Sequence, residues 1–215
     1  MPDSCIFIVD DDEDIRTSLS RALRTRGYSV EAYASAQAFL DSDATDRHGC
    51  LILDYGMPEM TGLELQQHLW KRGFRLPIIF ITGHGGIPEA VEAMKYGALD
   101  FLEKPFRQDA LIKRIDAALA LDAQNRQSEQ TARAAHRRLE SLTDREREIA
   151  AFLVANPAQS SSKDVARHLD ISPRTVDHHR ARILDKMNVA SVADLVNLSI
   201  AANLFPEIEY LSAHR

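Results

Sequence analysis

Acidic residues stand directly after two apolar runs in the first half of the chain. Asp10 and Asp11 follow the run 5–9, and Asp54 follows the run 49–53. Short runs with apolar residues at every position are typical of buried parallel strands. In an open sheet of such strands, ligands bind beyond the carboxyl ends, where the strand order reverses. We therefore expect these three carboxylates to converge at that edge.

A hydroxyl and an ammonium group stand at corresponding positions farther along. Thr82 follows the apolar run 77–81, and Lys104 comes just after the run 99–102. Neighbouring carboxylates repel one another and need a cation to remain ionised. Hard oxygen ligands at an open site favour Mg²⁺, and the hydroxyl and ammonium groups are donors for a phosphoryl group. The pattern predicts a Mg²⁺-dependent phosphoryl site.

The second half contains a helical segment with a polar outer face. Ser172 is a candidate N-cap, with Pro173 at the first helical position. Val176, Ile183 and Met187 have the spacing of a buried stripe. The positions left on the outer face are 174, 177, 178, 181 and 182. An exposed helix face of this kind can read base edges in the major groove of DNA.

The order of the elements that must position these residues indicates two fold classes. Five strand-like runs alternate with amphipathic segments up to about residue 121. This alternation predicts an α/β domain with a doubly wound, five-stranded parallel sheet, whose strands are apolar on both faces. The region after residue 138 predicts four short helices with a tight turn between the middle two, an all-α helix-turn-helix domain.

The predicted domain boundaries follow from these elements. The first domain spans 1–121, the second spans 139–205, and 206–215 is a tail. The segment 122–138 is rich in Ala, Gln, Glu and Arg and has almost no apolar stripe. Helix formers without a buried face predict a solvated helical linker, and a short dimer seam is the alternative.

Composition excludes several classes of protein. Of the 215 residues, 45% are hydrophobic and 27% are charged, the balance of a globular chain. No apolar run approaches the ~20 residues that span a bilayer, and no signal segment follows Met1. We expect a cytoplasmic protein with no membrane partner. Cys5 and Cys50 lie in predicted strands and should be reduced core residues.

The charge is distributed unevenly along the chain. Residues 1–122 hold 13 Lys and Arg against 20 Asp and Glu, whereas residues 123–215 hold 13 against 12. An acidic N-terminal part and a mildly basic C-terminal part indicate two domains with different partners. The basic excess is too small to establish nucleic-acid binding by itself.

The first half resembles the receiver domain of two-component response regulators, the CheY-like fold. The resemblance covers roughly residues 4–121 and rests on five motifs in order: Val9-Asp10-Asp11, Asp54-Tyr-Gly-Met57-Pro58, Thr82-Gly83, Asp100-Phe101 and Lys104-Pro105-Phe106. It implies that Asp54 takes a phosphoryl group from a cognate histidine kinase, and that Asp10, Asp11, Asp54 and the Gly56 carbonyl hold Mg²⁺. It also implies that Thr82 and Lys104 contact the phosphoryl group, that Phe101 then turns inward, and that the Lys104–Pro105 bond is cis.

The second half resembles the LuxR/NarL-type DNA-binding module, and the whole chain resembles a FixJ-type response regulator. The stretches Leu142–Ile149, Lys163–Leu169 and Ile171–Ile183 carry this resemblance. The partners that it implies are promoter DNA and a second copy of the phosphorylated chain, and RNA polymerase is a further candidate. Two departures are a longer loop at 156–162 and an acidic residue, Asp177, on the reading face.

We assign the expected DNA contacts to three groups. We expect the DNA backbone to be bound by Lys163, Arg174 and Thr175. Asp177, His178 and Ala181 occupy the base-facing positions, and Arg180 and Arg182 are flanking phosphate candidates.

Two other functions stay open at this point. The receiver could be a docking module on a phosphorylation-independent DNA-binding protein. Alternatively, the chain could be a Mg²⁺-dependent phosphohydrolase, although we expect no substrate pocket beyond the acidic crevice. His84, two residues past Thr82, is placed to influence hydrolysis of an acyl phosphate if it lies over the acidic site. We expect the phosphorylation-dependent regulator, an enzyme only toward its own Asp54.

Overall fold

The computed structural model describes residues 4–83 and 87–206, and His84 lies outside them. The chain divides into two compact units, Met1–Asn125 and Arg126–Arg215. Helix α5, Gln108–Glu140, crosses this division, so that the expected linker 122–138 lies within one continuous helix.

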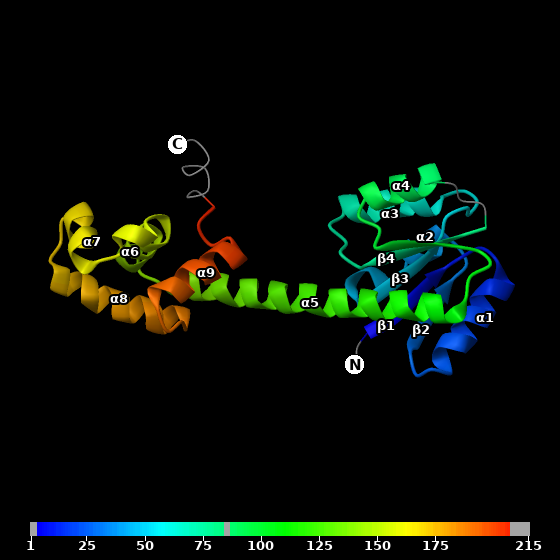
Figure 1. Cartoon of the computed structure of the whole chain (residues 1–215), viewed down its shortest axis with the longest axis horizontal. Helices are drawn as coiled ribbons and strands as arrows, with labels where there is room; N and C mark the ends of the chain where they lie inside the picture. The colour runs from blue at the N-terminus through cyan, green and yellow to red at the C-terminus, as the bar shows by residue number, and fades with distance from the viewer. Residues whose placement is uncertain (1–3, 84–86, 207–215) are drawn as a thin grey trace. The chain divides into compact units, whose positions relative to one another are not determined.

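The first unit is a five-stranded parallel sheet in the order β2-β1-β3-β4-β5. Helices α2, α3 and α4 lie on one face of the sheet, and α1 and the first part of α5 lie on the other (Figure 1). This is the doubly wound fold that the sequence predicts. Its elements are β1 Ser4–Val9, α1 Glu13–Arg24, β2 Ser29–Tyr33, α2 Ala36–Leu40, the 3₁₀ turn η1 Asp43–Asp46, β3 His48–Asp54, α3 Gly62–Lys71, β4 Ile78–Thr82, α4 Ile87–Lys95 and β5 Asp100–Glu103.

Two apolar layers sandwich the sheet because neighbouring strand residues point to opposite faces. In β1, Phe7 belongs to the core under α2 and α3, whereas Ile6 and Ile8 belong to the core under α1 and α5. The edge strand β2 departs from the expectation of two apolar faces: only Val30 is buried there. An edge strand has a neighbour on one side alone and keeps more contact with solvent.

Local signals fix where the site-bearing helices begin. Asp12 caps α1 by accepting hydrogen bonds from the backbone amides of Asp14 and Ile15. Thr61 and Glu64 form a capping box at the start of α3. Both caps lie in the connections that follow β1 and β3, so α1 and α3 begin near the edge that carries Asp10 and Asp54.

The second unit is all helical and has its own core. Val165, Val176, Ile183 and Met187 are fully buried in it. Its elements are α6 Asp144–Ala155, the 3₁₀ turn η2 Pro157–Gln159, α7 Ser162–Leu169, α8 Pro173–Met187 and α9 Val192–Ala202.

The end of α5 departs from the expected solvated linker. Ala135 is fully buried in the second core and Leu139 is nearly so, with Ala132 packed beside them. Three small or apolar residues at helical spacing therefore bury a face that the polar composition of the segment conceals.

The expectations for cysteines and membrane spans can also be compared with the model. Cys5 and Cys50 are buried and free, and burial raises the pKa of both thiols. Within residues 4–83 and 87–206, no helix combines the length and apolar character needed to cross a bilayer.

Candidate functional site

A lysine joins two buried carboxylates at the carboxyl edge of the sheet. Lys104 Nζ lies 2.9 Å from Asp10 Oδ2 and 2.7 Å from Asp54 Oδ1. Asp10 and Asp54 are 3% and 8% exposed. The two acids follow β1 and end β3, which are neighbours in the sheet, and Lys104 follows β5. The fold thus brings together three residues that the sequence predicts as one site.

Main-chain amides hold the other carboxylate oxygens. The Asp12 amide donates to Asp10 Oδ1 at 2.9 Å, and the Gly56 amide donates to Asp54 Oδ2 at 2.8 Å. Burial raises the pKa of Asp10 despite its bonds from Lys104 and Asp12, and the nearby Asp54 charge adds to the rise. Burial lowers the pKa of Lys104, but its bonds to both aspartates outweigh this and raise it overall.

The predicted metal ligands are only partly assembled. In the part of the chain that the structure describes, no three acidic, histidine or cysteine side chains are grouped as a metal site. Asp11 is exposed, so it does not complete a three-carboxylate set with Asp10 and Asp54. The donor set still fits Mg²⁺: two ionised carboxylates share one ammonium group, which leaves the pair net negative, and Mg²⁺ is bound through few carboxylates while keeping waters.

Thr82 and Phe101 are the residues that the resemblance implies respond to phosphorylation. Thr82 ends β4 and is 3% exposed, and its carbonyl accepts a hydrogen bond of 2.7 Å from the Lys104 amide. The Lys104–Pro105 bond is cis, as the resemblance to receiver domains implies. Phe101 already packs on Tyr55 and Phe80, with both pairs of ring centroids 6.4 Å apart. The ring of Phe101 is partly buried.

Two residues that support the site were missed from the sequence. Arg16 Nη1 donates to the Asp10 carbonyl at 2.8 Å and ties α1 to the end of β1. Gly62 lies so close to β3 that a Cβ atom there would approach the Asp54 carbonyl oxygen to 2.2 Å. The role of Gly62 could have been inferred from the sequence, because a glycine directly after a helix cap indicates close packing. Nothing in the sequence distinguishes Arg16 from an exposed arginine on a helix.

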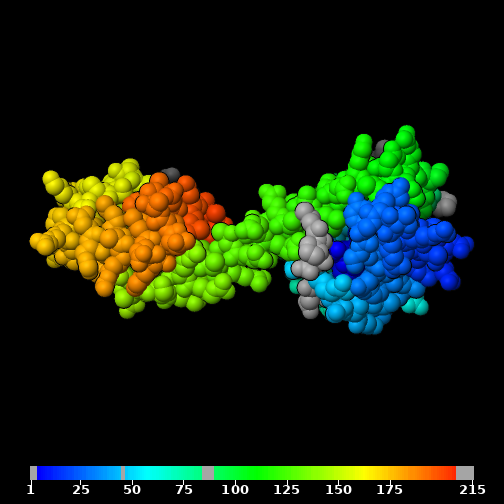
Figure 2. Space-filling model, turned by 90° about the horizontal axis from the view of Figure 1, so that it is seen from below, coloured from blue at the N-terminus to red at the C-terminus, as the bar shows by residue number. Residues whose placement is uncertain are grey.

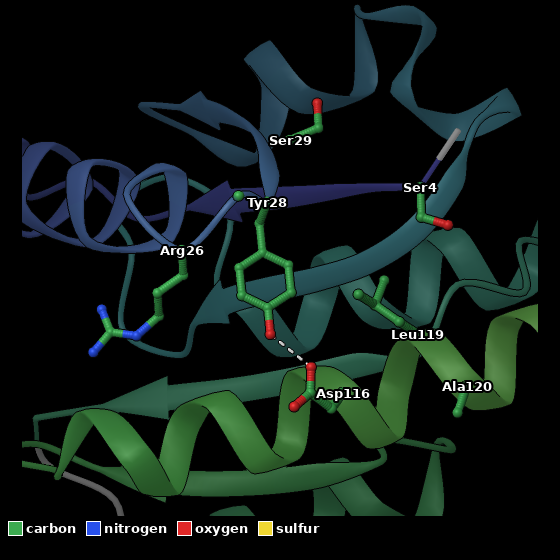
Figure 3. A pocket seen from close by; sticks show the side chains of 8 residues that line it. Ser4, Arg26, Tyr28, Ser29, Asp116, Leu119 and Ala120 are labelled. Carbon is green, nitrogen blue, oxygen red and sulfur yellow. Dashed lines mark hydrogen bonds between the residues drawn. The ribbon is translucent and has the colours of Figure 1, made fainter. Parts of the chain in front are cut away.

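The structure also has a hollow away from the acidic crevice. It has a volume of about 590 Å³ and lies at the opposite edge of the sheet, beside the first residues of β1 and β2. Tyr28, Asp116 and Leu119 line it, and the Tyr28 hydroxyl donates to Asp116 at 2.6 Å (Figure 3). Burial and this carboxylate raise the pKa of Tyr28 to about 12.

Helix α8 presents the polar face that the sequence predicts. Val176, Ile183 and Met187 are fully buried, and the segment containing α8 lies at the surface of its unit in gold and orange (Figure 2). Every predicted outer position is exposed: Arg174, Asp177, His178, Ala181 and Arg182.

The other candidate DNA contacts differ in their surroundings. Lys163 is exposed near the start of α7. The Thr175 hydroxyl lies 2.8 Å from that of Ser172, the residue that caps α8. Arg180 is half-buried, and its guanidinium donates to the Ser160 carbonyl.

Comparison with protein families assigns both units. A model described as response regulator receiver domain matches residues 6–116. A model described as bacterial regulatory proteins, luxR family, matches residues 140–199. The chain is a two-component response regulator. It is a transcriptional regulator with a receiver domain and a LuxR-type DNA-binding domain, which confirms the family and fold class that the sequence predicts.

Similar response regulators match nearly the whole chain. The transcriptional regulatory protein FixJ of Azorhizobium caulinodans is 41% identical over 96% of this chain and 97% of its own length. The response regulator protein TodT of Pseudomonas putida is 44% identical over 91% of this chain and 85% of its own. A solved structure of the response regulator StyR has a TM-score of 0.77 at 41% identity, and covers 91% of this chain and 98% of its own.

Proposed function

We propose that this response regulator binds promoter DNA under the control of phosphorylation at Asp54. The observation that carries the proposal is the bridge from Lys104 to Asp10 and Asp54. It places a carboxylate nucleophile beside a cation that can bind the incoming phosphoryl oxygens.

The chemical step is transfer of a phosphoryl group from a phosphohistidine of the cognate kinase. Asp54 Oδ1 attacks phosphorus, the P–O bond forms, and the electron pair of the breaking P–N bond returns to the imidazole nitrogen. Lys104 exchanges its bond to Asp54 for one to a phosphoryl oxygen, and the Thr82 hydroxyl donates to another. Hydrolysis of the acyl phosphate returns Asp54, so the only enzymatic activity is toward the protein itself.

Mg²⁺ fits this edge as the cofactor. Asp10, Asp54 and the Gly56 carbonyl would hold it, with Asp11 as a predicted ligand at the exposed rim. When bound, the ion would neutralise charge on the phosphoryl oxygens. Gly56 has a further role that needs no metal, because its amide orients Asp54.

The DNA-binding step uses the exposed face of α8 in the major groove. His178 and Ala181 face the bases, whereas Lys163, Arg174 and Arg182 bind phosphates. Thr175 lies in the first turn of α8 with Arg174 and contributes a contact to the DNA backbone. The charge added by phosphorylation, about −1.5 to −2 units, biases the receiver toward a form that dimerises and binds DNA more tightly.

The test is DNA binding with and without acetyl phosphate. A duplex is selected from a random pool, and its affinity is measured by fluorescence anisotropy in Mg²⁺ buffer for the wild type and Asp54→Asn. We expect acetyl phosphate to tighten binding of the wild type only. Equal binding in all samples would favour the docking-module alternative. Catalytic turnover of a chromogenic phosphate ester would instead support a phosphohydrolase.

A further inference from the structure

Two polar side chains of α8, exposed Asp177 and half-buried Arg180, are bound to the protein itself. Asp177 Oδ1 accepts a hydrogen bond from the Ser162 hydroxyl at 2.5 Å. One turn later, the Arg180 guanidinium donates to the Ser160 carbonyl. Positions three residues apart share a helix face, so both side chains of α8 reach the same segment before and at the start of α7. We name these two contacts the loop clamp.

Each serine of the run 160–162, which the loop clamp contacts, makes a hydrogen bond within the protein. Ser160 offers its carbonyl to Arg180, and Ser162 its hydroxyl to Asp177. Between them, Ser161 is the N-cap of α7 and accepts from the Asp164 amide at 3.2 Å. The two contacts of the clamp thus hold this segment against α8, the helix that carries the predicted reading face.

The contacts change what Asp177 and Arg180 can do at DNA. A free carboxylate on the reading face would repel phosphates or accept from a cytosine. The carboxylate of Asp177 is instead directed to the first residue of α7, where a negative charge favours the helix N-terminus. Half-buried Arg180 has a carbonyl partner, whereas Arg182 is exposed.

We propose that Asp177 and Arg180 are positioning residues rather than DNA contacts. They hold the 160–162 segment against α8 and so fix the place of Lys163 relative to the reading face. The inference rests on the proposed DNA-binding function and assigns two of its candidate contacts to a different role.

A double-mutant cycle tests the Asp177 half of the clamp. Asp177→Ala and Ser162→Ala should each weaken binding of the selected duplex about ten-fold, through one lost hydrogen bond. The double variant should bind no more weakly than either single one, because both changes remove the same contact. Asp177→Asn, which keeps an acceptor for the Ser162 hydroxyl, should recover most of the affinity. Base preference in a repeated selection should not change.

The salt dependence of binding tests the Arg180 half. Arg180→Met should weaken binding while leaving the slope of log affinity against log salt as in the wild type. The matched variant Arg182→Met removes a proposed phosphate contact and should reduce the slope by about one. Hydrogen exchange of amides 160–164 in the full-length free protein should accelerate in Asp177→Ala and Arg180→Met but not in Arg182→Met.

The outcomes separate this inference from the function on which it rests. A wild type that binds no duplex overturns the DNA-binding function and the inference with it. A wild type that binds, together with altered base preference in Asp177→Ala, additive effects in the cycle, or a reduced slope in Arg180→Met, overturns the inference alone.

Discussion

Lys104 illustrates how one side chain can stabilise a site and prepare it for chemistry. Its ammonium group contacts Asp10 and Asp54 within 2.9 Å. Two carboxylates of this burial would repel each other and protonate more readily without a cation between them. The same group is mobile enough, on its long side chain, to follow a phosphoryl oxygen. Both the stability of the site and the binding of a phosphoryl group therefore require a flexible cationic side chain at position 104.

Glu146 is the corresponding buried acid of the DNA-binding domain. It is 1% exposed, and Lys186 Nζ lies 2.6 Å from its carboxylate. Burial alone would raise its pKa, but bonds from Lys186 and Thr143 outweigh burial and lower the pKa to about 2. The carboxylate is thus tied both to α8 and to the cap of its own helix, α6.

We expect Glu146 to make the stability of this domain sensitive to acid. Because its pKa is lower in the folded state, the ionised form stabilises the fold above pH 4.5, and that contribution falls as the pH drops from there toward about 2. A shift of this size corresponds to at most about 3–4 kcal/mol. Glu146→Gln should therefore lower stability at pH 7 and flatten its decline between pH 5 and 3, as measured by urea unfolding.

Glu148→Gln is the matched control for that experiment. It removes the same charge two residues away in α6, where the carboxylate is half exposed and pairs with Arg145. Exposed ion pairs contribute about 0–1 kcal/mol, so this variant should keep the wild-type pH dependence. A steep decline that persists in Glu146→Gln would assign the acid sensitivity to other carboxyl groups.

At the scale of elements, the approach of α3 to β3 is the tightest constraint near Asp54. A Cβ atom at Gly62 would lie 2.2 Å from the Asp54 carbonyl oxygen and 3.0 Å from the Phe80 ring. The clash involves backbone, which cannot rotate away as a long side chain would. The absence of a side chain at Gly62 thus lets α3 begin directly against the strand that carries Asp54.

Gly62→Ala should consequently shift α3 or the end of β3. We expect a loss of about 1–3 kcal/mol, as for other overpacked cores, together with slower uptake of phosphoryl from acetyl phosphate. Urea unfolding and mass spectrometry of the intact protein measure the two effects. Gly83→Ala is a suitable control for stability, because a Cβ atom there would meet no atom within 4 Å. Wild-type stability of Gly62→Ala would show that the helix can move without cost.

The sequence predicted elements better than contacts between them. Continuous apolar runs marked the central strands and Ser172 marked the start of α8, because these signals are local. The buried face of Ala132, Ala135 and Leu139 in α5 was missed, since small residues give little periodic signal. The bonds of Asp177 and Arg180 to the serine run depend on tertiary packing, which no local pattern encodes.

At the scale of the whole molecule, helix α4 exposes two large apolar side chains at the surface of the receiver domain. Val91 and Met94 are 47% and 49% exposed, three residues apart on one face of the helix. Exposed apolar side chains that lie together are more typical of an interaction surface than scattered ones. The phosphorylated chain is proposed to dimerise, and this face of α4 is our candidate for the contact.

Met94→Glu should therefore separate phosphorylation from dimerisation. A buried charge without a partner at an interface is costly, so we expect the dimer dissociation constant to rise at least about ten-fold. Sedimentation velocity with acetyl phosphate and Mg²⁺ measures this change, while mass spectrometry checks that Asp54 is still phosphorylated. Trp70→Glu, which alters a side chain 60% exposed on α3, controls for the added charge and should dimerise as the wild type does. If Met94→Glu dimerises normally and Trp70→Glu does not, the contact lies on α3, and the phosphoryl group must act on that helix instead.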